Sequence, residues 1–166
     1  MAHDYVDSTT FENGTQIVSA PTSDEIAPVE HPRADVHLRL PADGAYASVL
    51  RTTTAALAAR LDFTIDDIQD LRIAVGEASA LVLPEADPGA DVTARFHLGR
   101  GTMTIEVETS AIDNPEPDRE SFAWQVLDTL TDDAVVESVG GVFRVRFSMT
   151  SQLAAGAATD TSGAEL

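Results

Sequence analysis

Glu77 is the acidic residue whose setting most strongly suggests chemistry. It lies in residues 70–83, Asp-Leu-Arg-Ile-Ala-Val-Gly-Glu-Ala-Ser-Ala-Leu-Val-Leu, and the apolar spacing of this stretch predicts a helix. Because residues four apart share a helix face, Asp70, Ala74, Glu77 and Leu81 form a stripe. An apolar seam suited to a core runs opposite this stripe: Ile68, Leu71, Val75, Ala78 and Val82. A buried carboxylate without a partner is costly, so Glu77 either reaches solvent or belongs to a site.

The elements that must position Glu77 follow from periodicity and turn signals. Strands are predicted at 36–40, 92–97, 102–108, 134–138 and 142–149, because apolar and polar residues alternate there. Helices are predicted from Gly44 to about Leu61, from a capping box at 64–67 to Pro84, and at 122–130 behind Ser121. The order β-α-α-β-β-α-β-β leaves too few crossovers for a parallel sheet. We therefore predict an α/β two-layer sandwich, with helices covering one face of a mostly antiparallel sheet.

The composition is that of one acidic globular domain. The chain has 166 residues, a net charge of −18, no cysteine and no lysine. Residues 34–150 carry 20 acidic residues against 9 arginines, a charge of −11, which disfavours nucleic acid and anionic membranes and suits a basic partner. Residues 1–33 and 151–166 are predicted to be disordered tails, the first of them acidic. With neither a signal peptide nor a spanning segment in the sequence, a cytoplasmic protein is expected.

Other candidates for chemistry are weaker. The histidines show no metal-ligand spacing, and without cysteine no metal site is predicted. Ser79, Ser110 and Ser121 lack a neighbouring His–acid pattern for nucleophilic catalysis. Trp124 is interpreted as a core residue, and Gly140-Gly141 as a hairpin turn rather than a phosphate loop.

Three strings carry a resemblance to a known family. They are 50–62, which begins Leu50-Arg51, then 70–78, which holds Glu77, and 121–133, which reads Ser-Phe-Ala-Trp-Gln-Val-Leu-Asp-Thr-Leu-Thr-Asp-Asp. In their order and spacing these strings resemble the anti-sigma factor serine kinases of the RsbW and SpoIIAB type, including the actinobacterial proteins called UsfX. That family belongs to the GHKL ATPase superfamily, and the resemblance covers about residues 35–150. It implies the Bergerat fold of the histidine-kinase-like ATPases.

The resemblance also implies an ATP and magnesium site, and this sequence departs from it in three places. In the family's Glu-x-x-x-Asn motif, Glu77 matches the catalytic acid, but Leu81 stands where Asn supplies an oxygen for magnesium. The family's Asp-x-Gly-x-Gly box corresponds to Glu108, Ser110 and Ile112, with Glu108 as the candidate adenine acceptor.

The family's last Gly-x-Gly box corresponds to Ser121 and Ala123. The segment between the last two boxes is acidic, which disfavours a triphosphate: it carries Asp113, Glu116, Asp118 and Glu120. Losses in all three boxes predict a degenerate site, so that no cofactor is expected unless the site still functions with ATP and magnesium.

By resemblance, the predicted function is binding. An anti-sigma factor sequesters an alternative sigma factor of the stress or sporulation class and is released by an anti-anti-sigma (STAS) protein. Arg51 matches a first-helix arginine that contacts both partners in the family, and a homodimer is expected. Three alternatives stay open: an active serine kinase that uses Glu77 and Glu108, an adaptor for an unrelated basic partner, and a purely structural role for the two residues. In that last case Glu77 is a solvated charge and Arg51 an ordinary exposed arginine.

Overall fold

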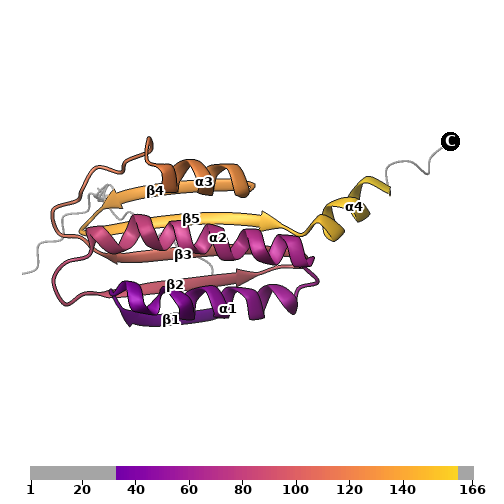
Figure 1. The fold of residues 1–166 in the computed structure, drawn as a ribbon, viewed down its shortest axis with the longest axis horizontal. Helices are drawn as coiled ribbons and strands as arrows, with labels where there is room; N and C mark the ends of the chain where they lie inside the picture. The colour runs from indigo at the N-terminus through magenta and orange to yellow at the C-terminus, as the bar shows by residue number, and fades with distance from the viewer. Residues whose placement is uncertain (1–32, 161–166) are drawn as a thin grey trace, which may run out of the picture. The chain divides into compact units, whose positions relative to one another are not determined.

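The protein is a two-layer α/β sandwich in the computed structural model, which describes residues 33–160 (Figure 1). The elements follow the predicted order, with a helix added at the end: β1 (Val36–Pro41), α1 (Ala47–Ala59), α2 (Ile65–Val82), β2 (Asp91–Leu98), β3 (Thr102–Ser110), α3 (Phe122–Leu130), β4 (Asp133–Val139), β5 (Val142–Thr150) and α4 (Gln152–Asp160). Short 3-10 turns, Gly44–Tyr46 and Leu83–Glu85, precede α1 and follow α2. The predicted fold class is confirmed.

The sheet has five strands in the order β1-β2-β3-β5-β4, and every neighbouring pair is antiparallel. Its two faces differ because side chains alternate along each strand. The face under the helices, here called the helix face, is apolar and includes Phe96, Ile105, Val107, Val145 and Phe147, all of them buried. The register places charged side chains on the other face, here called the opposite face: Arg95 lies across from Glu106, which lies across from Arg146.

Helix α2 is the central element of the helix layer. It contacts α1 on one flank, α3 on the other, and β3 and β5 beneath it (Figure 1). Contact on several sides buries more of α2 than a single seam would. Ala74, predicted to lie on the stripe opposite the core, is fully buried, and Leu81 of the same stripe packs against the core.

Helices α2 and α3 begin at the capping residues that the sequence predicted. Thr64 and Asp67 form a complete capping box: the Asp67 amide donates to Thr64 Oγ1 at 3.1 Å, and the Thr64 amide donates to Asp67 Oδ2 at 3.0 Å. Ser121 caps α3 by accepting from the Trp124 amide. The β4–β5 turn has positive φ at both Gly140 and Gly141, which a primed hairpin turn requires.

The chain beyond residue 150 departs from the prediction. A disordered tail was expected from residue 151, whereas Gln152–Asp160 form helix α4. The amide of Gln152 donates to Asp67 Oδ2 at 3.1 Å, so α4 starts on the carboxylate that caps α2. An alanine-rich segment has high helix propensity, and this anchor supplies a fixed first turn. The N-terminal tail, 1–33, lies outside the described residues except for Arg33, as do residues 161–166.

Asp67 should therefore stabilise two helices at once, and replacing it should lower the free energy of unfolding. Burial alone would raise the pKa of Asp67, but hydrogen bonds from Thr64 and Gln152 outweigh it and hold the pKa below the ordinary value of 3.8. When the pKa of a carboxyl group is lower in the folded state, the group contributes fully to the free energy of unfolding at pH values above its ordinary pKa. This contribution is lost as the pH falls through the folded-state pKa. We expect Asp67→Ala to cost about 1–2 kcal/mol at pH 7 in urea unfolding.

The difference between wild type and Asp67→Ala should shrink below pH 3.8. Asp66→Ala is the matched control, because Asp66 is the adjacent acidic residue in the first turn and is exposed. This change should lower the free energy of unfolding by only a few tenths of a kcal/mol. Equal losses in the two variants, or a difference independent of pH, would contradict this role for Asp67.

Candidate functional site

The structure brings Glu77 and Arg51 together, although they are 26 positions apart. Both side chains line an open surface hollow of about 270 Å³ between α1 and α2, together with Gln69, Arg72 and Ile73. We call it the Arg51 hollow. Arg51, Arg72 and Ile73 are exposed, and Glu77 is partly exposed. Glu77 therefore keeps access to solvent, which is one of the two settings that the sequence left open.

Gly76 is a residue of this site that the sequence analysis missed. It is buried in the interior of α2, and the Arg51 guanidinium lies directly over it. A Cβ at position 76 would come within 2.9 Å of Arg51 Nε, 3.0 Å of Nη2 and 3.4 Å of Cζ. The available signal was a glycine inside a predicted helix, where it is less favourable than alanine by about 1 kcal/mol and so suggests a packing reason.

Leu81, one turn beyond Glu77, supplies no polar atom. Its side chain is partly buried and packs against the hydrophobic core. Magnesium takes oxygen ligands, which a leucine side chain does not have. The residues of α2 therefore do not fit the magnesium site that the resemblance implies.

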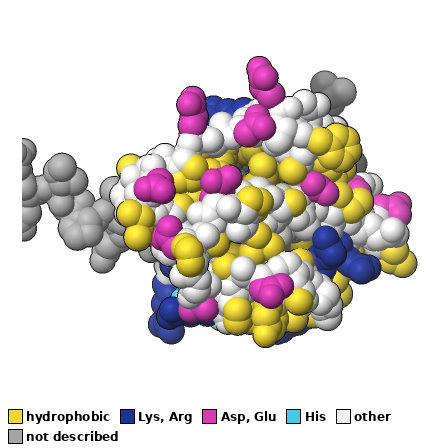
Figure 2. Space-filling model, turned by 60° about the vertical axis from the view of Figure 1, so that its left-hand side comes forward, with side chains coloured by type: hydrophobic (Ala, Val, Ile, Leu, Met, Phe, Trp, Pro, Cys, Tyr) yellow, Lys and Arg dark blue, Asp and Glu magenta, His cyan; other side chains and the backbone are white. Residues whose placement is uncertain are grey.

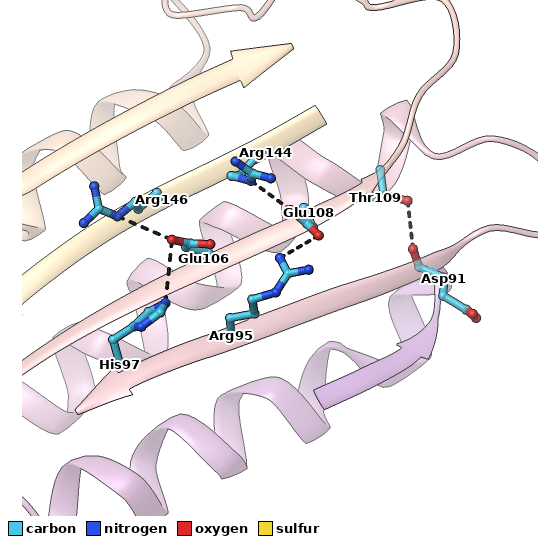
Figure 3. Close-up of polar contacts among 8 residues, drawn as sticks. All are labelled: Asp91, Arg95, His97, Glu106, Glu108, Thr109, Arg144 and Arg146. Carbon is cyan, nitrogen blue, oxygen red and sulfur yellow. Dashed lines mark hydrogen bonds and ion pairs between the residues drawn. The ribbon is translucent and has the colours of Figure 1, made fainter. Parts of the chain in front are cut away.

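Glu108 lies on the opposite face of the sheet (Figure 3), whereas Glu77 belongs to α2, which packs on the helix face. It accepts from Arg144 Nε at 2.8 Å and pairs with Arg95 Nη1 at 2.6 Å. Burial alone would raise the pKa of Glu108, but its contacts with Arg144 and Arg95 hold the pKa below the ordinary value of 4.5. A carboxylate so engaged, with α2 on the other side of the sheet, is not positioned to work with Glu77.

Strand alternation explains why Glu108 lies on the opposite face of the sheet. Met103, Ile105 and Val107 are buried on the helix face, so Glu108 must point the other way. The residue at this end of β3 that points toward the helices is Thr109, which is 3% exposed. Its hydroxyl donates to the Asp91 carbonyl at 3.0 Å. The alternation was readable in the sequence, and it places neighbouring residues of β3 on opposite faces of the sheet.

The remaining predicted nucleotide residues have structural roles or none. Ser110 is exposed at the end of β3, and its carbonyl accepts from the Asp87 amide. Ser121 Oγ donates to the Asp118 carbonyl and accepts from the Trp124 amide, so both of its functions serve the start of α3. Ala123 is partly buried in the first turn of that helix. The structure does not gather these residues around Glu108.

A second ion-pair group, which the sequence analysis did not identify, lies beside Glu108. Glu106 is only 8% exposed and lies between Arg146, whose Nε is 3.6 Å from Glu106 Oε1, and His97, whose Nε2 is 3.7 Å from the same oxygen (Figure 3). Alternating charges on neighbouring strands were the signal. Their pairing depends on the sheet register, so these contacts hold β2, β3 and β5 together rather than form a reactive site.

The acidic character of the chain is visible on its surface. Asp and Glu side chains are spread over the side of the molecule that Figure 2 presents, among exposed apolar residues. The loop before α3 carries four exposed acids: Asp113, Glu116, Asp118 and Glu120. Arg119 in the same loop donates to the Val136 carbonyl and lies 5.9 Å from the centre of the Trp124 ring.

Residues 33–160 contain neither a metal-ligand cluster nor a membrane-spanning helix. No group of three or more His, Asp or Glu side chains is arranged to hold a metal ion, and none of the helices there is long and apolar enough to cross a membrane.

The fold is an α/β sandwich with Glu77 on its central helix, and comparisons with known proteins confirm the predicted resemblance to RsbW. The serine-protein kinase RsbW of Halalkalibacterium halodurans is 37% identical over 78 residues, 46% of this chain and 48% of that protein. RsbW of Bacillus subtilis is 34% identical over 75 residues, 43% of this chain and 47% of that protein. The chain thus spans about half the length of the curated relatives it matches. No protein-family model matches it.

A solved structure shares the fold. The RsbU and RsbW domains of Rv1364c from Mycobacterium tuberculosis align with a TM-score of 0.52 and 18% sequence identity, over 70% of this chain and 32% of that chain. At this identity the comparison supports the α/β architecture alone.

Glu108 should behave as a structural residue. Glu108→Ala removes the carboxylate shared by two half-buried arginines, so we expect the free energy of unfolding to fall by about 1–3 kcal/mol at pH 7. The pKa of Glu108 is lowered in the folded state, so its contribution to the free energy of unfolding is complete above the ordinary pKa of 4.5. That contribution declines as the pH falls through the folded-state pKa. Urea unfolding between pH 7 and pH 3 measures both effects.

Glu137→Ala is the control, since Glu137 is exposed on the same face and lies across from Arg144 in β5. It should change the stability by less than about 0.5 kcal/mol. A loss for Glu108→Ala no larger than this would show that its ion pairs are dispensable.

Proposed function

We propose that this chain is an anti-sigma factor that regulates transcription by binding, with the Arg51 hollow as part of its partner surface. The observation that carries the proposal is the placement of Arg51 and Glu77 in one exposed hollow, on the two helix segments that resemble RsbW. Exposed guanidinium groups beside an apolar Ile73 suit a protein interface, where arginine is enriched. The functional unit is residues 34–150.

The proposed partners follow from the resemblance and from charge. An alternative sigma factor of the stress or sporulation class has basic DNA-binding regions, which an acidic domain attracts and orients during encounter. An anti-anti-sigma protein of the STAS type would compete for the same surface and release the sigma factor. A homodimer in the cytoplasm is the proposed assembly.

We further propose that the nucleotide site is degenerate, as in a pseudokinase. Leu81 supplies no oxygen for magnesium, and the Thr109 hydroxyl is already bonded to the Asp91 carbonyl. The Ser121 hydroxyl is engaged in capping α3. Without a phosphate-binding loop and a metal ligand, sequestration alone would carry the function.

Charge reversal at Arg51 tests the partner surface. Arg51→Glu should weaken binding to the sigma factor by tenfold or more, roughly the value of one lost charge-assisted hydrogen bond. Each alternative sigma factor of the source genome is purified and titrated in turn, with affinity measured by interferometry. Arg100→Glu is the control, because it makes the same charge change in the exposed β2–β3 turn. Equal binding by both variants would remove Arg51 from the interface.

A serine kinase is the second candidate function, because Glu77 keeps access to solvent and the curated relatives are named serine-protein kinases. In that case Glu77 would polarise the hydroxyl of a serine on the anti-anti-sigma protein.

Nucleotide titration separates the two candidates. We expect no heat of binding when the protein is titrated with Mg-ATP or Mg-ADP to millimolar concentration, because the residues present do not fit the metal. Micromolar affinity, with phosphate transfer to a STAS protein that Glu77→Ala abolishes, would instead establish the kinase.

A further inference from the structure

We propose that Gly76 is a positioning residue, which sets where the Arg51 guanidinium lies on the surface of α2 and thereby makes Arg51 available to a partner. This inference rests on the proposed function for its last step only. The position of the guanidinium is a property of the unbound protein and can be measured without a partner.

The argument starts from the space over Gly76. The three atoms nearest to a Cβ built there are Nε, Nη2 and Cζ of Arg51, at 2.9, 3.0 and 3.4 Å. Real side chains essentially never approach a Cβ closer than 3.0 Å, so an alanine at 76 would displace the guanidinium. Outside the backbone of α2 itself and the two chain neighbours of Gly76, every other atom lies farther away than these three atoms of Arg51.

The side chain that would move is long and exposed. Arg51 is on the surface of α1, and its planar fork crosses from one helix to the other over the missing Cβ. Arginine side chains carry about 2 kcal/mol of rotamer entropy, so an unsupported guanidinium samples many positions before it binds. Contact with the α2 backbone at Gly76 restricts these positions in advance, which reduces the ordering that binding requires.

The orientation matters for the Arg51 hollow as a whole. Gly76 directly precedes Glu77, and Arg72 and Ile73 lie one turn earlier on α2. A guanidinium seated over Gly76 therefore stands beside the other lining residues, whereas a displaced one would move away from α2. A glycine retained inside a helix despite its lower helix propensity is consistent with this use of the space.

A double-mutant cycle in the unbound protein tests the positioning. Gly76→Ala and Arg51→Ala are made singly and together, and the urea midpoint is measured for each. With Arg51 present, the new Cβ must displace the far end of a flexible side chain, and this cost offsets part of the gain from alanine, so Gly76→Ala should raise the midpoint less than it does when Arg51 is absent. With Arg51→Ala the clash is gone and alanine is the better helix former, so the same change should raise the midpoint.

Arg72→Ala is the matched control background. Arg72 lines the same hollow but is not among the atoms nearest to Gly76, so Gly76→Ala should have the same effect there as in wild type. In addition, the Arg51 Nε–Hε resonance should move in Gly76→Ala. An equal midpoint shift in all backgrounds, with an unmoved resonance, would overturn the proposal.

Binding supplies the last step. Gly76→Ala should lower the affinity for the sigma factor identified in the titrations above by about tenfold. It should have no further effect on that affinity when Arg51 is already alanine. Equal losses in the two backgrounds would mean that Gly76 acts on binding by another route. If wild type binds no sigma factor, the proposed function fails, while the unfolding cycle still decides whether Gly76 positions Arg51.

Discussion

The burial of α2 across the middle of the sheet is the constraint from which the other features of this protein follow. A helix flanked by α1 and α3 and supported by β3 and β5 can expose only a narrow strip. Small residues are concentrated in its second half, where Ala74, Gly76 and Ala78 are all buried. Three accessible polar residues of α2, Gln69, Arg72 and Glu77, line the Arg51 hollow together with Arg51 of α1.

The two faces of the sheet are stabilised by different interactions. The helix face is an apolar core, whereas the opposite face is held by ion pairs that link three strands. Glu106 and Glu108 each interact with a side chain from both neighbouring strands, which matches charge to register and disfavours a slipped pairing. Arginines employed in this way do not offset the acidic loops, so the remaining surface keeps a negative field toward a basic partner.

The surroundings of Glu77 favour recognition over nucleotide chemistry. The acid is retained, but Leu81, one turn along α2, packs against the core, and the hydroxyls of Thr109 and Ser121 are already bonded within the protein. Beside Glu77 lie instead Arg51 of α1 and, on α2, Arg72 and the exposed Ile73. Such a surface can bind a partner without a metal ion or a phosphate loop, which is consistent with the proposed sequestration.

The sequence by itself determined the fold class, the order of the elements up to β5 and the starts of α2 and α3. These depend on short-range physics: strand alternation, the Thr64–Asp67 capping box, the Ser121 cap and the paired glycines of the last hairpin all lie within a few residues. The face on which Glu108 lies was also readable from alternation along β3.

Only the tertiary structure decided which distant residues meet. Arg51 and Gly76 come together because α1 and α2 pack side by side, and the Gln152 amide reaches Asp67 because β5 ends beside the start of α2. Contacts of this kind depend on how whole elements pack against one another and on which side chains occupy the space left by the absent Cβ of a glycine. No local pattern encodes those distances, since they arise only when the layers are packed together.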